Sequence, residues 1–425
     1  MTASAFPLES VAAPIGAYDG EDPLFQRALR IAAYLRREAT AIRSGDVIWL
    51  MPSVEPGRPR VPMDPHLYSG STGVAYFLAA LDHLQGTQEH RDIVLRGMAP
   101  LRRKIGELAD DPAHAAASRA PIGGLVGIGA WIYGLVRIGQ WTGEAEMITD
   151  ALRASVLITP ERLAADDQLD VTRGAAGAVL ALTALDAAGA GTAPDGRAPL
   201  DVARACAAYL LEMHAGHEGS PRAWWVNGEP PRNGFAHGAS GIACALLRLH
   251  GRTGDAALRD AALEGFAYER HLWDAAERNW WDPHYDRFLQ LQSWCFGAPG
   301  TLLARLEALR TADTPEVRAD LDDTLRRTAE YPDEPVDHFC CGNFGRAEIL
   351  ATAAEVLDDS VLHETARDIA VRALARAETE DDFGFMPPGT APLLRLSLFR
   401  GLAGMGYALV RLANPGRLPS PLAMQ

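Results

Sequence analysis

GSTGVAYFLAALDHL (residues 70–84) joins a G-x-x-G tetrad to a long apolar run, and this combination recurs along the chain. Seven such tetrads occur, and their first glycines lie 54, 50, 64, 59, 45 and 59 residues apart. A period near 50 residues is typical of a protein built from repeated units. The seven tetrads are Gly70–Gly73, Gly124–Gly127, Gly174–Gly177, Gly238–Gly241, Gly297–Gly300, Gly342–Gly345 and Gly401–Gly404.

The runs that follow the tetrads predict helices packed on several sides. AAGAVLALTALDAA after Gly174 and LAGMGYALVRL after Gly401 are apolar on most faces. Between the tetrads lie amphipathic stretches with charged faces, such as residues 23–43 and 360–378. Each unit therefore combines one amphipathic and one apolar helix, so seven units predict about 14 helices.

The last repeat indicates a closed array. An open solenoid needs polar capping repeats at its ends, but the helix predicted after Gly401 is as apolar as the others and lies about 20 residues from the last residue. We therefore expect an all-α fold, an α/α-toroid with seven inner and seven outer helices and every glycine turn at one mouth. Because the repeat continues across the Pro/Gly-rich loops, we expect a single domain over residues 1–425, with an irregular segment over residues 1–20.

Composition limits the class of protein. The 425 residues carry a net charge of −15, which argues against a nucleic-acid partner because such partners select a basic face. No apolar run approaches the ~20 residues of a membrane helix, and the N-terminal residues lack the pattern of a secretory signal. We expect a cytoplasmic protein without membrane insertion. Five cysteines, two of them adjacent, do not form a disulfide framework in a chain of this length.

Three tetrads carry reactive side chains, which suggests that they form the active site. Cys295 lies two residues before Gly297, and Cys340 and Cys341 directly precede Gly342. Three thiolates with one open position suit a catalytic zinc, whereas small buried cysteines are the alternative. The two other cysteines, Cys206 and Cys244, lie among alanines and leucines and are expected to be structural.

Two further residues are candidates for acid–base chemistry. His237 directly precedes Gly238 and could be a fourth ligand, a general acid or base, or a structural histidine. Asp170 lies four residues before Gly174 and could orient a partner or cap the next helix. His338, two residues before Cys340, is a weaker candidate for ligation or for supporting a ligand.

Two tryptophan pairs lie in or near the connections that precede reactive tetrads. Packing in the core or in loops is one interpretation, and lining a peptide cleft is the other. The pairs are Trp224–Trp225 and Trp280–Trp281.

The combined motifs resemble the lanthionine synthetase C-like (LanC) cyclases. The resemblance runs from about Leu67 to Leu412 and is carried by the tetrads, GFAHGASG (234–241), SWCFGAPG (293–300) and CCGNFGR (340–346). It implies an α/α-toroid with a central zinc, which adds peptide cysteine thiols to dehydroalanine or dehydrobutyrine to form thioether rings. It further implies zinc ligation by Cys295, Cys340 and Cys341 and proton transfer by His237, with Asp170 as the nearby acidic residue.

The departure from the family pattern is Cys341, because the usual Cys-His-Gly is Cys-Cys-Gly here. This variant resembles the cyclase domain of LanM-type lanthipeptide synthetases. Only about 66 residues precede the repeats, so the resemblance implies a dehydrated precursor peptide, with leader and core, as partner and a separate dehydratase.

Two other functions remain open from the sequence. A LanC-like protein could add a free thiol such as glutathione to dehydrated residues or serve as a zinc-binding partner of another enzyme. An α/α-toroid acting on glycans or isoprenoids would carry clustered carboxylates, and Asp381–Asp382 is such a pair, although its polar surroundings favour a loop.

Overall fold

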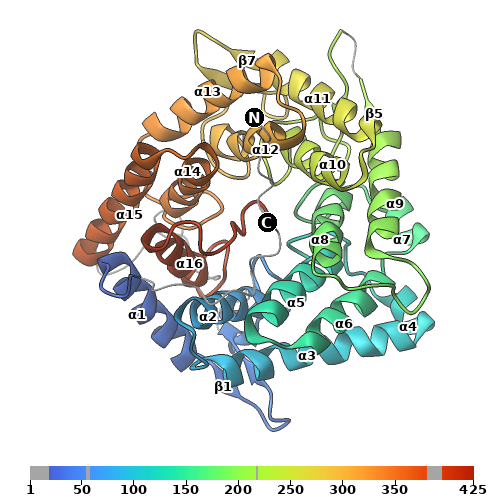
Figure 1. Ribbon diagram of the computed structural model, residues 1–425, viewed down its shortest axis with the longest axis vertical. Coiled ribbons are helices and arrows are strands. Elements are labelled where there is room, and N and C mark those ends of the chain that lie inside the picture. Colours follow the sequence, from blue (N-terminus) through green and yellow to red (C-terminus); the bar gives the residue numbers. More distant parts are fainter. Residues whose placement is uncertain (1–18, 54–57, 217–218, 381–394) are drawn as a thin grey trace.

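The computed structural model describes residues 19–53, 58–216, 219–380 and 395–425, and these ranges form sixteen helices, most of them in two concentric rings (Figure 1). The inner ring consists of α2 (Ser71–Gln85), α5 (Ile128–Thr142), α8 (Ala175–Ala187), α10 (Ala239–Thr253), α12 (Ala298–Thr311), α14 (Asn343–Leu357) and α16 (Leu402–Ala413). The outer ring consists of α1 (Pro23–Arg37), α3 (Arg91–Asp110), α6 (Ala145–Ser155), α9 (Pro199–Glu212), α11 (Ala256–His271), α13 (Pro315–Glu330) and α15 (Ser360–Glu380). The predicted toroid of seven inner and seven outer helices is confirmed. Two short helices, α4 (Pro112–Ala117) and α7 (Pro160–Ala164), are additions in the connections.

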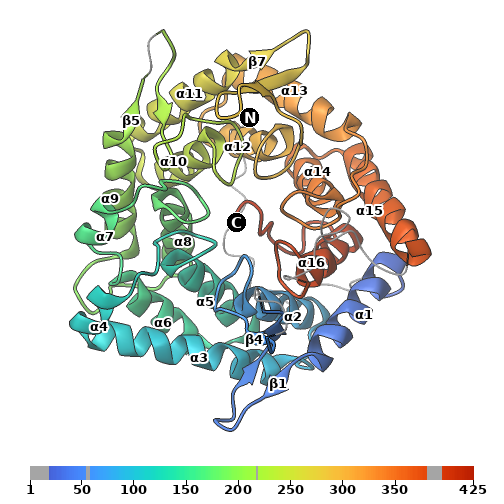
Figure 2. The same ribbon diagram turned by 180° about the vertical axis from the view of Figure 1, so that it is seen from behind.

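The two rings close on themselves. Each inner helix packs on the next inner helix and on the outer helix of its own unit. Helix α16 contacts α2, and α1 packs against α16, so the first helix of the chain completes the last unit. Figures 1 and 2 show this closed ring from its two ends.

Burial explains which helices form which ring. Helix α8 carries alanine, valine and leucine around its whole circumference and is buried almost throughout. Helix α1 buries a single face at helical spacing, which includes Phe25, Ile31 and Leu35. Inner helices therefore have protein on every side, whereas outer helices keep a polar face to solvent.

Small antiparallel sheets decorate the connections. Three sheets have two strands, which pair as β1 (Thr40–Ala41) with β2 (Val47–Ile48), β3 (Leu50–Met51) with β4 (Val61–Pro62), and β5 (His214–Ala215) with β6 (Ala223–Trp224). In the fourth, the central strand β8 (Asn279–Asp282) pairs with β7 (Trp273–Asp274) and with β9 (Arg287–Phe288). Among the helices in the described ranges, none has the length and apolarity to cross a membrane. The carboxylate pair Asp381–Asp382 and most of the expected irregular segment 1–20 lie outside the described residues.

A glycine occupies the N-cap position of every inner helix. Space requires it at Gly70, where a Cβ would lie 1.9 Å from the carbonyl oxygen of Asp64. In the second unit the N-cap is Gly127, with φ of 111°, so the helix begins after the last glycine of the predicted tetrad. The first glycine of that tetrad, Gly124, instead packs against the next unit, where a Cβ would lie 2.8 Å from the carbonyl oxygen of Gly177.

Because glycine offers no capping side chain, the first N–H groups of the inner helices need acceptors from elsewhere. Other parts of the chain supply these acceptors: Asp166 for α8, Glu269 for α10 and Gln292 for α12, at nitrogen–oxygen distances of 2.7, 2.9 and 2.9 Å. The connections are thereby fastened to the turns that form the mouth.

The residues after α16 return into the centre of the ring, where the C-terminus is visible in both views (Figures 1 and 2). The Tyr407 hydroxyl donates to the carbonyl of Pro419 at 2.8 Å, and Trp294 Nε1 donates to the carbonyl of Leu422 at 3.0 Å. Leu422 and Met424 are buried. This lumen segment (residues 418–425) therefore lies inside the inner ring and reaches the level of the turns, where the Met424 side chain packs beside Gly124.

Candidate metal centre

The residues two positions before the N-cap glycines form a ring around the mouth. This mouth ring consists of Tyr68, Leu125, Thr172, Ala236, Cys295, Cys340 and Phe399. The N–H groups of Cys340, Phe399 and Tyr68 donate to the carbonyls of Phe399, Tyr68 and Leu125, at 2.9, 3.1 and 3.1 Å. The series continues from the Leu125 N–H to the Thr172 carbonyl at 3.2 Å and from the Thr172 hydroxyl to the Ala236 carbonyl at 3.4 Å. The shared position within each repeat thus brings side chains far apart in sequence to one place.

The three predicted thiols converge at this ring. The sulfur atoms of Cys295 and Cys340 lie 2.8 Å apart, and that of Cys341 lies 3.4 Å from that of Cys340. All three sulfurs lie within 4.8 Å of one another, and within the described ranges they are the one such group of potential ligands. A tetrahedral zinc with Zn–S bonds of about 2.3 Å separates its sulfurs by about 3.8 Å. The sulfurs at 2.8 and 3.4 Å are closer than this, so the three side chains would move slightly apart to hold the ion.

The thiols share negative charge unequally. Hydrogen bonds from Cys295 and Cys340 hold the pKa of the Cys341 thiol well below its usual value. Hydrogen bonds with the two partners, together with burial, raise the pKa of Cys295. The arrangement therefore favours a thiolate at Cys341, and a thiolate is the form that binds metal.

Tyr68 is a member of the site that the sequence analysis missed. Its hydroxyl donates to the Cys340 sulfur at 3.0 Å, and its ring stacks on Phe399 with 5.0 Å between centroids. The available signal was positional, since Tyr68 precedes its glycine by two residues, as Cys295 and Cys340 do.

His237 and Asp170 form a pair beside the thiols. The Nδ1 atom of His237 lies 2.6 Å from Oδ2 of Asp170, whose side chain is buried, whereas the His237 side chain is 38% exposed. The other oxygen of Asp170 accepts the N–H of Arg173 at 2.7 Å and that of Gly174 at 3.2 Å. Asp170 therefore hydrogen-bonds both to the backbone at the start of α8 and to His237.

The geometry separates His237 from the group that could hold a metal. It does not belong to the three-thiol cluster, but its ring lies 5.7 Å from that of Phe296, the residue that follows Cys295. A carboxylate accepts hydrogen bonds only, so the Nδ1 of His237 carries the proton and Nε2 is left free as an acceptor. The position suits proton transfer beside the thiols.

His338 contacts the backbone of the thiol cluster. It is buried, and its Nδ1 accepts the backbone N–H of Cys341 at 3.3 Å. Burial lowers the pKa of His338 to about 4, so the ring is neutral and can accept this hydrogen bond. Cys206 and Cys244 are buried away from the cluster, as expected, and burial raises the pKa of each to about 12.

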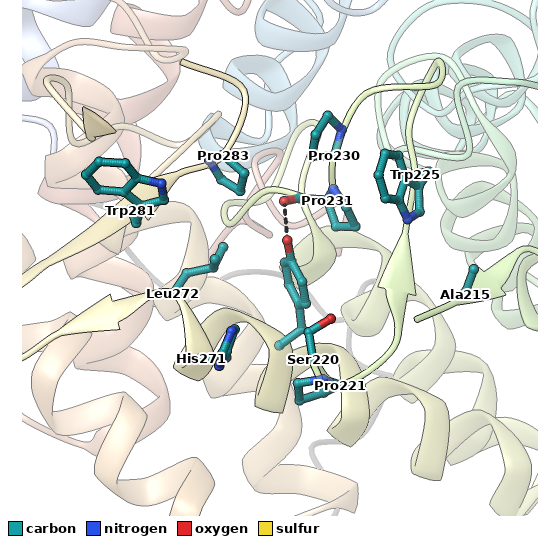
Figure 3. A pocket seen from close by; sticks show the side chains of 11 residues that line it. Ala215, Ser220, Pro221, Trp225, Pro230, Pro231, His271, Leu272, Trp281 and Pro283 are labelled. Carbon is teal, nitrogen blue, oxygen red and sulfur yellow. Dashed lines mark hydrogen bonds between the residues drawn. The ribbon is translucent and has the colours of Figure 1, made fainter. Parts of the chain in front are cut away.

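The tryptophan pairs divide between core and surface. Trp224 and Trp280 are buried, whereas Trp225 and Trp281 line a pocket of about 280 Å³ with four prolines (Figure 3). Alternation along a strand explains the division of Trp280 and Trp281, because successive side chains of β8 point to opposite faces. Tyr268 also lines the pocket, and its hydroxyl donates to the Pro231 carbonyl at 3.0 Å.

The closed double ring and its three-thiol mouth define an α/α-toroid with a candidate metal site. The chain matches the model of the family described as lanthionine synthetase C-like protein over residues 61–424, and it belongs to that family. This confirms the resemblance drawn from the motifs.

Comparison with solved structures gives the same fold. Nisin cyclase aligns with a TM-score of 0.58 at 13% identity, covering 84% of this chain and 91% of that one. Dfg5 from Chaetomium thermophilum in complex with glucosamine aligns with a lower TM-score of 0.45 at 12% identity, covering 93% of this chain and 91% of that one. A search of curated proteins finds no match.

Proposed function

We propose that this protein is a zinc-dependent lanthipeptide cyclase, which forms lanthionine and methyllanthionine rings in a dehydrated precursor peptide. The observation that carries the proposal is the convergence of Cys295, Cys340 and Cys341 at the mouth of a LanC-like toroid. Three thiols leave a tetrahedral ion one open position, which is the donor set of a catalytic site. When bound, zinc would act as a Lewis acid that activates the substrate thiol as a nucleophile.

The reaction forms a bond between the thiol sulfur and the β-carbon of the dehydrated residue and places a proton on its α-carbon. His237 is suited to move this proton, because Asp170 fixes its Nδ1–H and leaves Nε2 available. The exposed ring of His237 can meet a substrate that enters at the mouth. Asp170 acts as a positioning residue that stabilises the protonated ring.

The Cys-Cys-Gly sequence alters the charge of the centre. A donor set of three cysteines carries one more negative charge than one of two cysteines and a histidine. We infer that this increases the reactivity of the attacking sulfur and relaxes substrate discrimination.

The remaining features of the proposal concern the setting of the enzyme. We propose that residues 1–425 act as one toroidal domain in the cytoplasm, where the five free cysteines stay reduced. A separate dehydratase would supply the substrate by removing water from serine and threonine residues of the precursor.

Zinc analysis combined with thiol trapping tests the proposal. A synthetic peptide with one cysteine and one dehydroalanine is incubated with the protein, and free thiol is counted by mass spectrometry after alkylation. We expect about one zinc per chain and enzyme-dependent loss of the thiol at unchanged peptide mass. Absence of zinc, or mass gain from added glutathione without ring formation, would refute the proposed function.

A further inference from the structure

Tyr68 contacts the thiol cluster through its hydroxyl, which donates to the sulfur of Cys340 at 3.0 Å. The mouth ring fixes the backbone of the tyrosine on both sides, because its N–H donates to the Leu125 carbonyl and its carbonyl accepts the Phe399 N–H, both at 3.1 Å. The carbonyl of Phe399 in turn accepts the N–H of Cys340 at 2.9 Å. Tyr68 and Cys340 are therefore held in place by the same series of hydrogen bonds.

Aromatic packing fixes the direction of the Tyr68 ring. This ring stacks on that of Phe399 with 5.0 Å between centroids and an interplanar angle of 18°. Phe399 also contacts the rings of Trp294 and Phe339, at 5.0 and 6.3 Å, and each of these two residues directly precedes a thiol of the cluster. Stacking needs only a ring, and Phe399 itself occupies its mouth-ring position without a hydroxyl. The hydroxyl of Tyr68 is therefore a feature that packing does not explain.

Metal binding would change the hydrogen bonding of the three thiols. Their mutual contacts, at 2.8 and 3.4 Å, need S–H protons, and a thiol gives up its proton when it binds zinc. Three thiolates outweigh the charge of a divalent ion, and Cys295 and Cys340 are only 7% and 4% exposed. The loaded centre would therefore be a largely buried anion, which needs hydrogen-bond donors. The phenol of Tyr68 keeps its proton at neutral pH and can supply one.

We propose that Tyr68 is a positioning residue of the metal centre, whose hydroxyl donates to the Cys340 thiolate and offsets the negative charge that the third cysteine adds. The inference rests on the proposed zinc site and assigns one more residue to it. The hydrogen bond withdraws electron density from the sulfur, so it stabilises the charged centre and moderates the donation of this ligand to the metal. Because Cys341 supplies a charge that a histidine would lack, the need for the donor follows from the Cys-Cys-Gly sequence.

Tyr68→Phe keeps the ring and removes the donor, so zinc affinity is the first measurement. Competition of the full chain with a chromophoric chelator at neutral pH should show an affinity about tenfold or more below that of the wild type. Tyr209→Phe is the matched control, because this tyrosine of α9 donates its hydroxyl to the Asp166 carbonyl at 2.7 Å instead of to a thiol, and it should bind zinc as the wild type does. Equal affinity of Tyr68→Phe and the wild type, or an equal loss in Tyr209→Phe, would overturn the proposal.

Cobalt in place of zinc gives a second readout, which a merely structural role of Tyr68 would not move. Without the hydrogen bond the sulfur of Cys340 is a stronger donor, so the sulfur-to-cobalt charge-transfer band of Tyr68→Phe should shift to longer wavelength. The band is read on the cobalt-bound fraction, so lower affinity or partial unfolding does not change its position. A band at the wild-type position would contradict a hydrogen bond from Tyr68 to the bound thiolate.

A double-mutant cycle tests the link to the third cysteine. In the Cys341→His background the centre carries less negative charge, so adding Tyr68→Phe should lower zinc affinity by less than about threefold. The same fold-loss in both backgrounds would overturn the charge argument. Absence of zinc binding by the wild type would refute the metal centre itself, whereas tight zinc binding that Tyr68→Phe leaves unchanged would refute the assignment of Tyr68 alone.

Discussion

Replacing Asp170 by asparagine tests whether the buried carboxylate serves the histidine or only the helix. In the wild type one oxygen accepts two backbone N–H groups of the α8 cap, and the other contacts His237 Nδ1 at 2.6 Å. Asparagine keeps an oxygen for the cap and places its NH2 group against Nδ1. The ring must then carry its proton on Nε2, which removes the acceptor that the reaction needs.

The structure sets the expected magnitude. The lost contact is a charge-assisted hydrogen bond in a buried position, with a net value of about 1.5–3 kcal/mol. If this stabilisation applies to the protonated ring in the transition state, the rate of thiol loss should fall roughly 10- to 150-fold. Zinc content and the unfolding midpoint should change little, because the ligands and the cap are retained.

Asp166→Asn is the matched control, since this carboxylate also caps α8 but has no hydrogen bond to His237 in the described residues. Cyclisation of the dehydroalanine peptide is followed by alkylation and mass spectrometry for both variants. An Asp170→Asn enzyme with zinc bound and a rate within about twofold of wild type, or equal slowing by Asp166→Asn, would show that Asp170 is only a cap.

Three other predictions follow from the same contacts. Cys341→His replaces an anionic ligand by a neutral one, so we expect zinc content to be retained and cyclisation to slow; an equal or faster rate would contradict the charge argument. Glu269→Ala removes the 2.6 Å partner of buried Arg305, which keeps its 3.0 Å ion pair with Asp320, and it also uncaps α10. The free energy of unfolding in urea titration should fall by about 2–3 kcal/mol; a loss under about 1 kcal/mol would contradict this. Burial raises the pKa of Asp166 from 3.8 to about 6, so its proton is bound more tightly in the folded state. The free energy of unfolding of the wild type should therefore fall by up to about 3 kcal/mol, relative to that of Asp166→Asn, as the pH rises from about 4 to about 6. The same pH dependence of the unfolding free energy in both proteins would refute this.

The sequence predicts the architecture well because steric constraints require glycine at the same position of each repeat. An N-cap glycine enclosed by backbone, as at Gly70, tolerates no side chain, so the period is visible in one sequence. The second unit shows the limit of this signal. Gly124 is required by packing against Gly177 rather than by the helix start, and a tetrad pattern does not distinguish these two causes.

The site was predictable where chemistry coincides with the repeat position. Cys295 and Cys340 share the place two residues before the N-cap glycine, and His237 and Cys341 directly precede theirs. Tyr68 shares the first place, but tyrosine is not a zinc ligand of choice, so only the 3.0 Å contact reveals it. The two oxygens of Asp170 face different partners, and spacing along a chain does not encode this arrangement.

The lumen segment determines how a long peptide can be handled. Leu422 and Met424 are buried inside the inner ring, so the lumen segment lies in the way of a chain that would pass along the axis. A long peptide therefore cannot pass along the axis from one end of the toroid to the other. In the proposed cyclase reaction, each cysteine and its acceptor would then enter as a loop from one side, and the finished ring would leave by the same side. The order of ring closure would follow from which loop of the peptide fits the site next, and not from one-way passage along the peptide.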